Sequence, residues 1–281
     1  MVGFAVHDDD AMRRLVVGVD GSQPAANALR WACALAGRFD AELIVAVAGP
    51  EETQAVAARE DWSGPATEAG VRSRVVALRW EPGPALIDCV DAHDADLLVV
   101  GRRADAPRFG IGSVATYVAH LAGRPFALVP SGATARVPER FVLGLDGSQA
   151  SQGAAAWAAP IARELNAEMV GVYAQWPMPE LLATIPPAMR DRARAQLEQW
   201  VAPLRAFGAV ELSVCEARDP VDGLLGCTDS TSVDAIVIGT RRLGGLRPMR
   251  LGGVTMHLLH RSTVPVVVVP ASAENHPSIT P

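Results

Sequence analysis

Two aspartates lie at the same position of a repeated motif, where a carboxylate can contact a small ligand. Asp20 lies in the segment LVVGVDGSQ of residues 15–23, and Asp146 lies in FVLGLDGSQ of residues 141–149, which is 126 residues later. In each copy an apolar run typical of a buried parallel strand ends in Asp-Gly-Ser, and an alanine-rich run typical of a helix follows. The repeat indicates one α/β domain present twice. An aspartate in such a turn also often bonds to its own backbone, and that interpretation stays open.

The elements that would position these aspartates alternate along both halves of the chain. In the first half we predict strands at 15–20, 43–48, 75–80, 97–100 and 126–129, and helices at 25–39, 51–58, 84–93 and 114–121. In the second half we predict strands at 141–145, 169–173, 210–214, 235–238 and 266–269, and helices at 154–165, 189–207, 221–228 and 255–260. This order predicts an α/β fold of two tandem domains, each a five-stranded parallel sheet with helices on both faces. We expect domain 1 at 1–134, domain 2 at 140–271 and a flexible tail at 272–281.

The loop after the fourth strand of each half is rich in glycine and arginine. It covers residues 101–114 in the first half and 239–254 in the second. Glycines let the backbone approach an anion closely, and the N-terminus of the next helix offers unpaired N–H groups. We expect Ser113 to cap its helix and to donate to a phosphate. If the first and fourth strands are neighbours, aspartate and loop share one crevice beyond the carboxyl ends of the strands. The alternative is an ordinary strand–helix turn with solvated arginines.

The composition excludes several kinds of chemistry. All 25 basic residues are arginine, so a phosphate-binding lysine and a lysine Schiff base are both absent. The net charge of −6 argues against nucleic-acid binding, and no apolar run is long enough to span a membrane. Acidic residues at 8–10 do not suit a signal peptide, so we expect a cytoplasmic protein. The four cysteines form no CxxC pair, and together with the histidines they show no metal-ligand spacing. We therefore predict no metal-ligating and no catalytic residues.

On these features the chain resembles a tandem universal stress protein. The resemblance covers nearly all of both halves and is carried by the Asp-Gly-Ser opening, the fourth strand ending in glycine, the Gly-Ser-Val helix start at 112–114, and closing strands such as PVVVVP at 265–270. It implies the five-stranded parallel sheet of this family, similar to that of adenine nucleotide alpha-hydrolases. The ATP-binding members carry Gly-x2-Gly-x9-Gly-Ser/Thr after the fourth strand. Their first-strand aspartate contacts the nucleoside, and the residue that ends the second strand lines the adenine pocket.

Carried over by position, the resemblance implies a site in each half. The site of the first half would contain Asp20, Ala48, Val100, Gly101, Arg103, Gly112, Ser113 and Val114. The site of the second half would contain Asp146, Ala174, Ile238, Gly239, Arg241, Gly252, Gly253 and Val254. The implied ligand is ATP or another adenine nucleotide, with Mg²⁺ if it is bound.

Both loops depart from the ATP-binding pattern. In the first half Ala104 replaces the second glycine, and seven residues instead of nine separate it from Gly112. The second half keeps the nine-residue spacing, but Arg242 replaces the second glycine and Gly253 replaces the residue with a hydroxyl. A Cβ at a glycine position can obstruct close approach of the backbone, whereas Arg103 or Arg242 can supply positive charge.

We expect a cytosolic stress-response protein that binds adenine nucleotide in one or both domains and acts as a nucleotide-dependent regulator, with at most weak ATP hydrolysis. One alternative, favoured by the substituted glycines, is a protein-interaction module with degenerate nucleotide sites. Another is a slow ATPase, for which only Asp20 and Asp146 offer a base or metal ligand.

The valine-rich closing strands at 126–129 and 266–269 predict how the two halves associate. An apolar strand at the edge of a sheet needs cover, and subunits of the family associate through this strand. We expect the two copies to pair as an internal pseudo-dimer. A homodimer of whole chains and unknown protein partners remain open.

Overall fold

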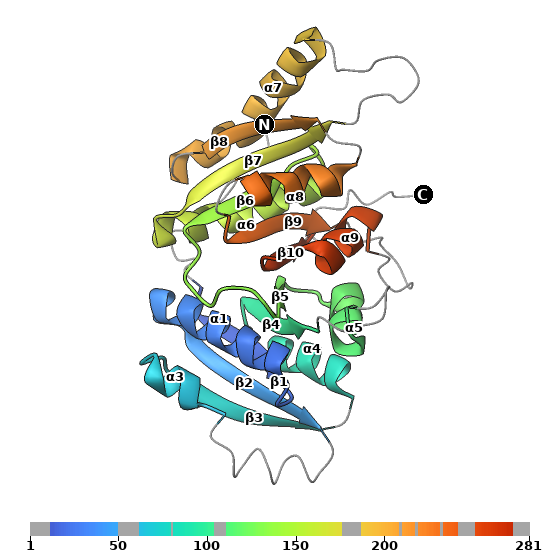
Figure 1. The fold of residues 1–281 in the computed structure, drawn as a ribbon. Coiled ribbons are helices and arrows are strands. Elements are labelled where there is room, and N and C mark those ends of the chain that lie inside the picture. Colours follow the sequence, from blue (N-terminus) through green and yellow to red (C-terminus); the bar gives the residue numbers. More distant parts are fainter. Residues whose placement is uncertain are drawn as a thin grey trace, which may run out of the picture.

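The computed structural model contains one continuous sheet that joins both halves of the chain (Figure 1). The structure describes residues 12–49, 62–79, 81–103, 111–175, 187–207, 210–216, 219–230, 233–240 and 251–271. Ten strands follow the order β3-β2-β1-β4-β5-β10-β9-β6-β7-β8. Within each half all paired strands are parallel, and the first strand lies beside the fourth. The predicted α/β class is confirmed, and the condition that the first and fourth strands are neighbours is met.

The two halves repeat the same order of elements. The first half contains β1 (Arg14–Val19), α1 (Gln23–Phe39), β2 (Glu42–Gly49), α3 (Gly64–Glu68), β3 (Ser73–Arg79), α4 (Pro82–Ala92), β4 (Leu97–Arg102), α5 (Ser113–Leu121) and β5 (Phe126–Pro130). The second half contains β6 (Arg140–Gly144), α6 (Gln149–Leu165), β7 (Glu168–Gln175), α7 (Pro187–Val201), the 3-10 helix η1 (Ala202–Phe207), β8 (Val210–Glu216), α8 (Pro220–Ser230), β9 (Ala235–Thr240), α9 (Gly253–Arg261) and β10 (Val266–Pro270).

Some helix boundaries differ from those predicted. α6 begins at Gln149 instead of residue 154, because the side chain of Ser148 caps it by accepting from the N–H of Ser151 at 3.2 Å. The helix predicted for 189–207 ends as an α-helix at Val201 and continues as a 3-10 helix. The short helix α3 was not predicted, because glycine and proline interrupt its sequence. The helix predicted at 51–58 and the tail predicted at 272–281 lie outside the described residues.

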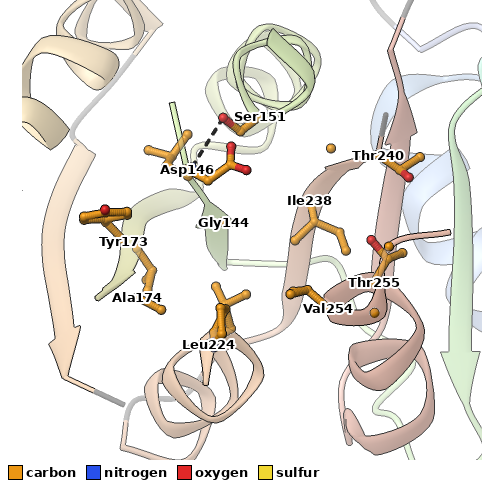
Figure 2. A pocket seen from close by; sticks show the side chains of 16 residues that line it. Gly144, Asp146, Ser151, Tyr173, Ala174, Leu224, Ile238, Thr240, Val254 and Thr255 are labelled. Atoms are coloured by element: carbon orange, nitrogen blue, oxygen red, sulfur yellow. Dashed lines mark hydrogen bonds between the residues drawn. The ribbon is translucent and has the colours of Figure 1, made fainter. Parts of the chain in front are cut away.

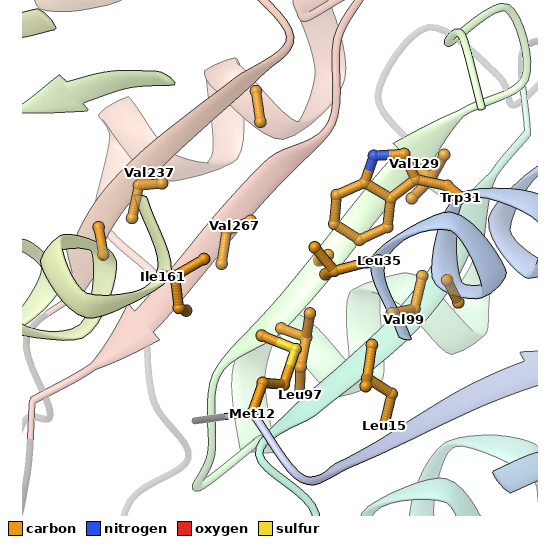
Figure 3. Close-up of a cluster of buried hydrophobic side chains, with 14 of the residues drawn as sticks. Met12, Leu15, Trp31, Leu35, Leu97, Val99, Val129, Ile161, Val237 and Val267 are labelled. Carbon is orange, nitrogen blue, oxygen red and sulfur yellow. The ribbon is translucent and has the colours of Figure 1, made fainter. Parts of the chain in front are cut away.

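Two apolar layers cover the two faces of the sheet. Val17 of β1 packs toward the layer that contains α1, whereas its neighbour Val16 packs toward the layer that contains α4 and α5. This alternation follows from the period of two along a strand. Figure 3 shows the first layer continuing across both halves, with Ile161 and Val267 of the second half facing Leu35 of the first. Burial on both faces explains why the central strands β4, β5, β9 and β10 are almost wholly apolar.

The two halves meet where β5 pairs with β10 in antiparallel register. Ala127 pairs with Val267, and these residues hold the same position in the two copies, 140 residues apart. A pseudo-twofold axis therefore passes between them, and Figure 1 shows this seam at the middle of the molecule. Arg38 and Glu164, another matched pair, meet near the axis through an Nη2–carbonyl hydrogen bond of 3.0 Å. The predicted pairing of the two closing strands is confirmed.

Carboxylates fix the starts of the two central strands in the same way. Asp96 Oδ2 accepts the backbone N–H groups of Arg13 and Arg14 at 2.7 and 2.9 Å. Asp234, 138 residues later, accepts those of Glu139 and Arg140 at 2.8 and 3.0 Å. Charged acceptors strengthen such hydrogen bonds, so β1 and β6 begin at equivalent, fixed places. Among the helices of the described ranges, none is long and apolar enough to cross a membrane.

Candidate functional site

The Asp-Gly-Ser turns place a carboxylate at the carboxyl end of the first strand of each half. Asp20 Oδ1 accepts the N–H of Ser22 at 3.0 Å, and Asp146 Oδ1 accepts that of Ser148 at 2.9 Å. The intervening Gly21 has a φ of +79°, a conformation that glycine adopts without strain. Each aspartate therefore has the local role that remained open from the sequence. Both carboxylates are also exposed and line a cavity.

Close packing brings the fourth strand against the start of the first helix. A Cβ on Gly101 would lie 2.4 Å from the carbonyl oxygen of Pro24, and one on Gly239 would lie 2.0 Å from that of Ala150. Only glycine allows this approach. The end of the fourth strand and the Asp-Gly-Ser turn thus border the same crevice in each half.

The cavity of the second half is the larger one, with a volume of about 450 Å³. It is lined by Gly144, Leu145, Asp146, Ser151, Val172, Tyr173, Ala174, Pro220, Leu224, Ile238, Gly239, Thr240, Gly252, Gly253, Val254 and Thr255. Figure 2 shows Tyr173 and Ala174 on one side and Ile238 and Val254 on the other, with Asp146 beside the start of α6. The rings of Tyr173 and Trp200 pack nearly at right angles, with centroids 5.4 Å apart.

The cavity of the first half has a volume of about 190 Å³. It is lined by Gly18, Val19, Asp20, Ser22, Pro24, Ala25, Ala46, Pro82, Leu86, Val100, Gly101, Arg103, Ile111, Gly112, Ser113, Val114 and Ala115. Its place in the fold is the same as that of the larger cavity, because β1, β4 and α5 correspond to β6, β9 and α9.

The structure brings most of the residues carried over from the resemblance into these two cavities. In the first half the cavity is lined by Asp20, Val100, Gly101, Arg103, Gly112, Ser113 and Val114. In the second half it is lined by Asp146, Ala174, Ile238, Gly239, Gly252, Gly253 and Val254. Arg241, Ala104 and Arg242 lie outside the described residues, and of Ala48 only the strand backbone is described.

Sequence reasoning did not select four hydroxyl residues of the larger cavity. Ser151, Tyr173, Thr240 and Thr255 occupy positions where the first half has Ala25, Val47, Arg102 and Ala115. The repeat offsets of 126, 138 and 140 residues contained the signal, because they reveal where the copies differ in chemistry. The same offsets match Leu86 with Leu224, which line the two cavities from α4 and α8.

The N-terminus of the last helix of each half opens into its cavity. Ser113 was predicted to cap α5, and this is wrong: Ser113 is the first helical residue, and Gly112 is the N-cap, with no side-chain cap hydrogen bond. α9 begins in the same way after Gly252. In the described part of the chain, the N–H groups of Gly253 and Val254 have no acceptor. The larger cavity therefore has free donors, and each cavity has the positive end of a helix dipole.

Titratable groups outside the two cavities include His120, His260 and Cys33, which are partly or fully buried in the fold. His120 Nδ1 lies 2.7 Å from the carbonyl oxygen of Thr116, one turn earlier in α5. Burial and the nearby Arg102 guanidinium lower the pKa of His260, at the matching place in α9. Burial raises the pKa of the Cys33 thiol to about 11. In the portion of the chain that the structure describes, no three His, Cys, Asp or Glu residues are grouped to hold a metal ion.

Two domains of one family account for the fold and the paired cavities. Residues 12–130 and 138–270 each match the model of the universal stress protein family. The chain therefore belongs to the universal stress protein family and carries its domain twice.

Known proteins of the same family match along most of the chain. A universal stress protein of Mycolicibacterium smegmatis is 26% identical over 287 residues, which cover 91% of this chain and 96% of that protein. One from Mycobacterium tuberculosis is 29% identical over 203 residues; the match covers 66% of this chain and 65%, less than two thirds, of that relative. The solved structure of a universal stress protein from Archaeoglobus fulgidus aligns with a TM-score of 0.72 at 16% identity. The alignment covers 92% of this chain and 98% of that chain, and it shows the same fold.

Proposed function

We propose that the second half binds an adenine nucleotide and that the protein acts as a nucleotide-dependent regulator in a stress response. One observation carries the proposal: in the larger cavity an apolar slot, a carboxylate and a helix N-terminus border a single space of about 450 Å³. This volume lies within the roughly 300–1,000 Å³ that small-molecule sites occupy. The family resemblance supports the choice of adenine nucleotide.

The apolar walls suit a planar base. Ala174 at the end of β7 faces Ile238 and Val254 across the cavity, and Leu224 of α8 lies between them (Figure 2). Val254 is 37% exposed, a large exposed fraction for an apolar side chain at a helix start. A base that enters the slot would cover it, which removes apolar surface from water.

Asp146 suits the sugar. Its Oδ1 atom is held by the Ser148 N–H at 2.9 Å, so the carboxylate has a fixed place at the cavity wall. A ribose presents hydroxyl donors, and a charged acceptor makes a strong hydrogen bond to them.

The start of α9 suits the phosphates. Gly253 and Val254 are the first residues of α9 and line the cavity, and a helix N-terminus with its unpaired N–H groups and dipole favours an anion. Thr255 and Thr240 add hydroxyl groups; the two residues are only 5% and 4% exposed, and no hydrogen bond of either hydroxyl is found within the described residues. Because both residues line the cavity, each hydroxyl is placed to donate a hydrogen bond to a phosphate oxygen there.

The smaller cavity supports a different role for the first half. Its volume of about 190 Å³ is below the usual range for a nucleotide-sized ligand. The same position that carries Thr255 in the second half carries Ala115 in the first. We propose that the first half binds nucleotide weakly or not at all, as expected for a degenerate site.

Calorimetric titration with ATP tests the proposal, with the two matched aspartates as each other's control. We expect one ATP site per chain in the wild type. Asp146→Ala should weaken this site by about tenfold or more, the effect of losing a hydrogen bond to a charged group. Asp20→Ala should change the affinity by less than about twofold, since it lies in the other cavity.

The contrary outcomes are equally specific. Absence of saturable binding at millimolar ATP would overturn the proposal and leave the interaction module. A larger loss of affinity in Asp20→Ala than in Asp146→Ala would assign the site to the first half instead. Phosphate release above a no-protein control, lost in Asp146→Ala, would support the slow ATPase.

A further inference from the structure

A guanidinium group of the first half contacts the end of a helix in the second half. Arg102 Nη1 donates to the carbonyl oxygens of Leu259, at 3.0 Å, and His260, and Arg102 Nη2 donates to that of Ser262 at 2.8 Å. These carbonyls end α9, where no helical N–H can reach them. A cation at this end also interacts favourably with the helix dipole.

The opposite end of the same helix forms the phosphate side of the larger cavity. Gly253, Val254 and Thr255 are the first residues of α9, and all three line that cavity. The helix has nine residues, so about 13 Å separates its two ends. Rigid secondary elements can carry energetic coupling between sites at their two ends.

Arg102 itself has little freedom to move. It pairs with Pro130 at the end of β4, and its neighbours Gly101 and Arg103 line the smaller cavity. A Cβ on Gly101 would lie 2.4 Å from the carbonyl oxygen of Pro24, so the strand end is packed directly on α1. The guanidinium therefore connects a closely packed strand end of the first half directly to the end of α9.

The contact has no counterpart from the second half to the first among the residues described. Thr240 ends β9 and pairs with Pro270, as Arg102 pairs with Pro130. Its short side chain lines the larger cavity, and no hydrogen bond from it to the end of α5 is found among the described residues. The asymmetry matches the asymmetry of the cavities, because the helix that is held across the seam belongs to the half with the larger site.

We propose that Arg102 of the first half is a positioning residue for the nucleotide site of the second half. By holding the last turn of α9, it sets where the first-turn N–H groups and Thr255 meet the phosphates. The inference rests on the proposed function and adds a dependence of one half's site on a residue of the other half.

Affinities for ATP and adenosine separate positioning of the phosphate side from general loss of stability. We expect Arg102→Met to weaken ATP binding by about fivefold, a small effect for coupling between distant sites, and to leave adenosine binding within about twofold. Arg102→Lys keeps a cation but only one donor nitrogen, so it should restore part of the difference. Arg136→Met is the matched control: Arg136 pairs with Asp234, which lies just before β9 and bonds to the start of β6, away from the cavities. It should leave the ratio of the two affinities unchanged.

Hydrogen exchange of the full-length protein without nucleotide provides a test that does not depend on ligand binding. Arg102→Met should speed exchange of the amides at both ends of α9, and Arg136→Met should not. If the wild type binds neither ATP nor adenosine, the proposed function fails, while faster exchange at residues 253–256 would still support the mechanical link. If the wild type binds ATP but Arg102→Met lowers both affinities equally, or leaves the exchange of α9 unchanged, the positioning role is wrong.

Discussion

The two cavities occupy the same place in two copies of one fold and differ in size and lining. The cavity of the second half measures about 450 Å³ and that of the first about 190 Å³. The aspartates that border them sit in turns with nearly the same hydrogen-bond geometry, at 3.0 and 2.9 Å. The backbone frame is therefore common to both halves, and the side chains at a few matched positions make the difference.

That difference follows a simple pattern of substitution. The larger cavity has hydroxyl groups from Thr240, Thr255 and Ser151, whereas the smaller one has Arg103 and Ser113 as polar groups near the loop. Duplication retained the elements that fold the sheet and allowed the residues around the crevice to change. These differences are the basis of the proposals that the second half binds the ligand and that the first half positions its site across the seam.

The seam offers the largest test of how far the two halves are equal. Phe126 and Val266 hold matched positions in β5 and β10, and both are only 1% exposed. We expect Phe126→Ala to lower the free energy of unfolding by about 4 kcal/mol and Val266→Ala by about 2 kcal/mol, because the larger side chain leaves the larger cavity. Urea denaturation measures both. The control Val75→Ala, at an exposed position, should lower this free energy by less than about 0.5 kcal/mol. Equal losses for Phe126→Ala and Val266→Ala would contradict the expected difference between the two strands.

The hydroxyl groups of the larger cavity offer the next test. Thr255→Val keeps the shape of the side chain and removes its hydroxyl, so we expect ATP affinity to fall about tenfold. Ser113→Ala removes a hydroxyl in the smaller cavity and should have no measurable effect on the ATP site of the larger cavity. Calorimetric titration with ATP measures the affinity of both variants. An unchanged affinity in Thr255→Val would mean that the threonine does not contact the ligand.

The glycines that precede α5 and α9 should differ in how much an added side chain lowers the free energy of unfolding. Gly112 has a φ of +96°, where other residues are strained, whereas Gly252 has a φ of −59°, and a Cβ there would meet nothing within 4 Å. We expect Gly112→Ala to cost about 1 kcal/mol and Gly252→Ala to be close to neutral. Thermal unfolding without nucleotide measures both values, and a reversed order would show that the two helix starts are more alike than their backbones indicate.

The smallest expected effect concerns a buried thiol that only the first half has. Cys33 is buried and its pKa is raised to about 11, whereas the matched position of the second half is Ala159. A raised pKa in the folded state favours the neutral thiol, so its stabilising contribution is complete below about pH 9 and is lost as pH rises through about 11. We expect Cys33→Ala to show a smaller decrease in the free energy of unfolding between pH 9 and 11 than the wild type. Urea denaturation at each pH measures this free energy. The same dependence on pH in the wild type and in Cys33→Ala would show that the thiol does not contribute to the pH dependence of stability.

Much of the fold was predictable because its signals are local. The runs that precede Asp20 and Asp146 are apolar over the length of a strand, and Gly21 and Gly147 mark turns with positive φ. Boundaries were less certain where a cap decided them, as when Ser148 starts α6 five residues before the predicted position. Helix α3 was missed because its glycine and proline are read as breakers, although packing of Ala66 into the core stabilises it.

The candidate site was predictable only in outline. The repeat placed Asp146 and Gly239 at the crevice, because strand ends follow from the order of elements, and the resemblance added Gly252. It did not identify Thr240 or Thr255, because the resemblance directed attention to the hydroxyl position that Gly253 occupies. A family pattern finds residues that match and passes over those that have changed.

The sequence by itself determined the repeated α/β unit, the two Asp-Gly-Ser turns and the pairing of the closing strands, since hydrophobic period, glycine conformation and exposed apolar edges act over short stretches of chain. The tertiary structure alone decided the volumes of the cavities and the contact of Arg102 with residues that lie 157 to 160 positions further along the chain. Such contacts depend on how packed elements meet across the seam, and no local pattern encodes which side chain will reach across it.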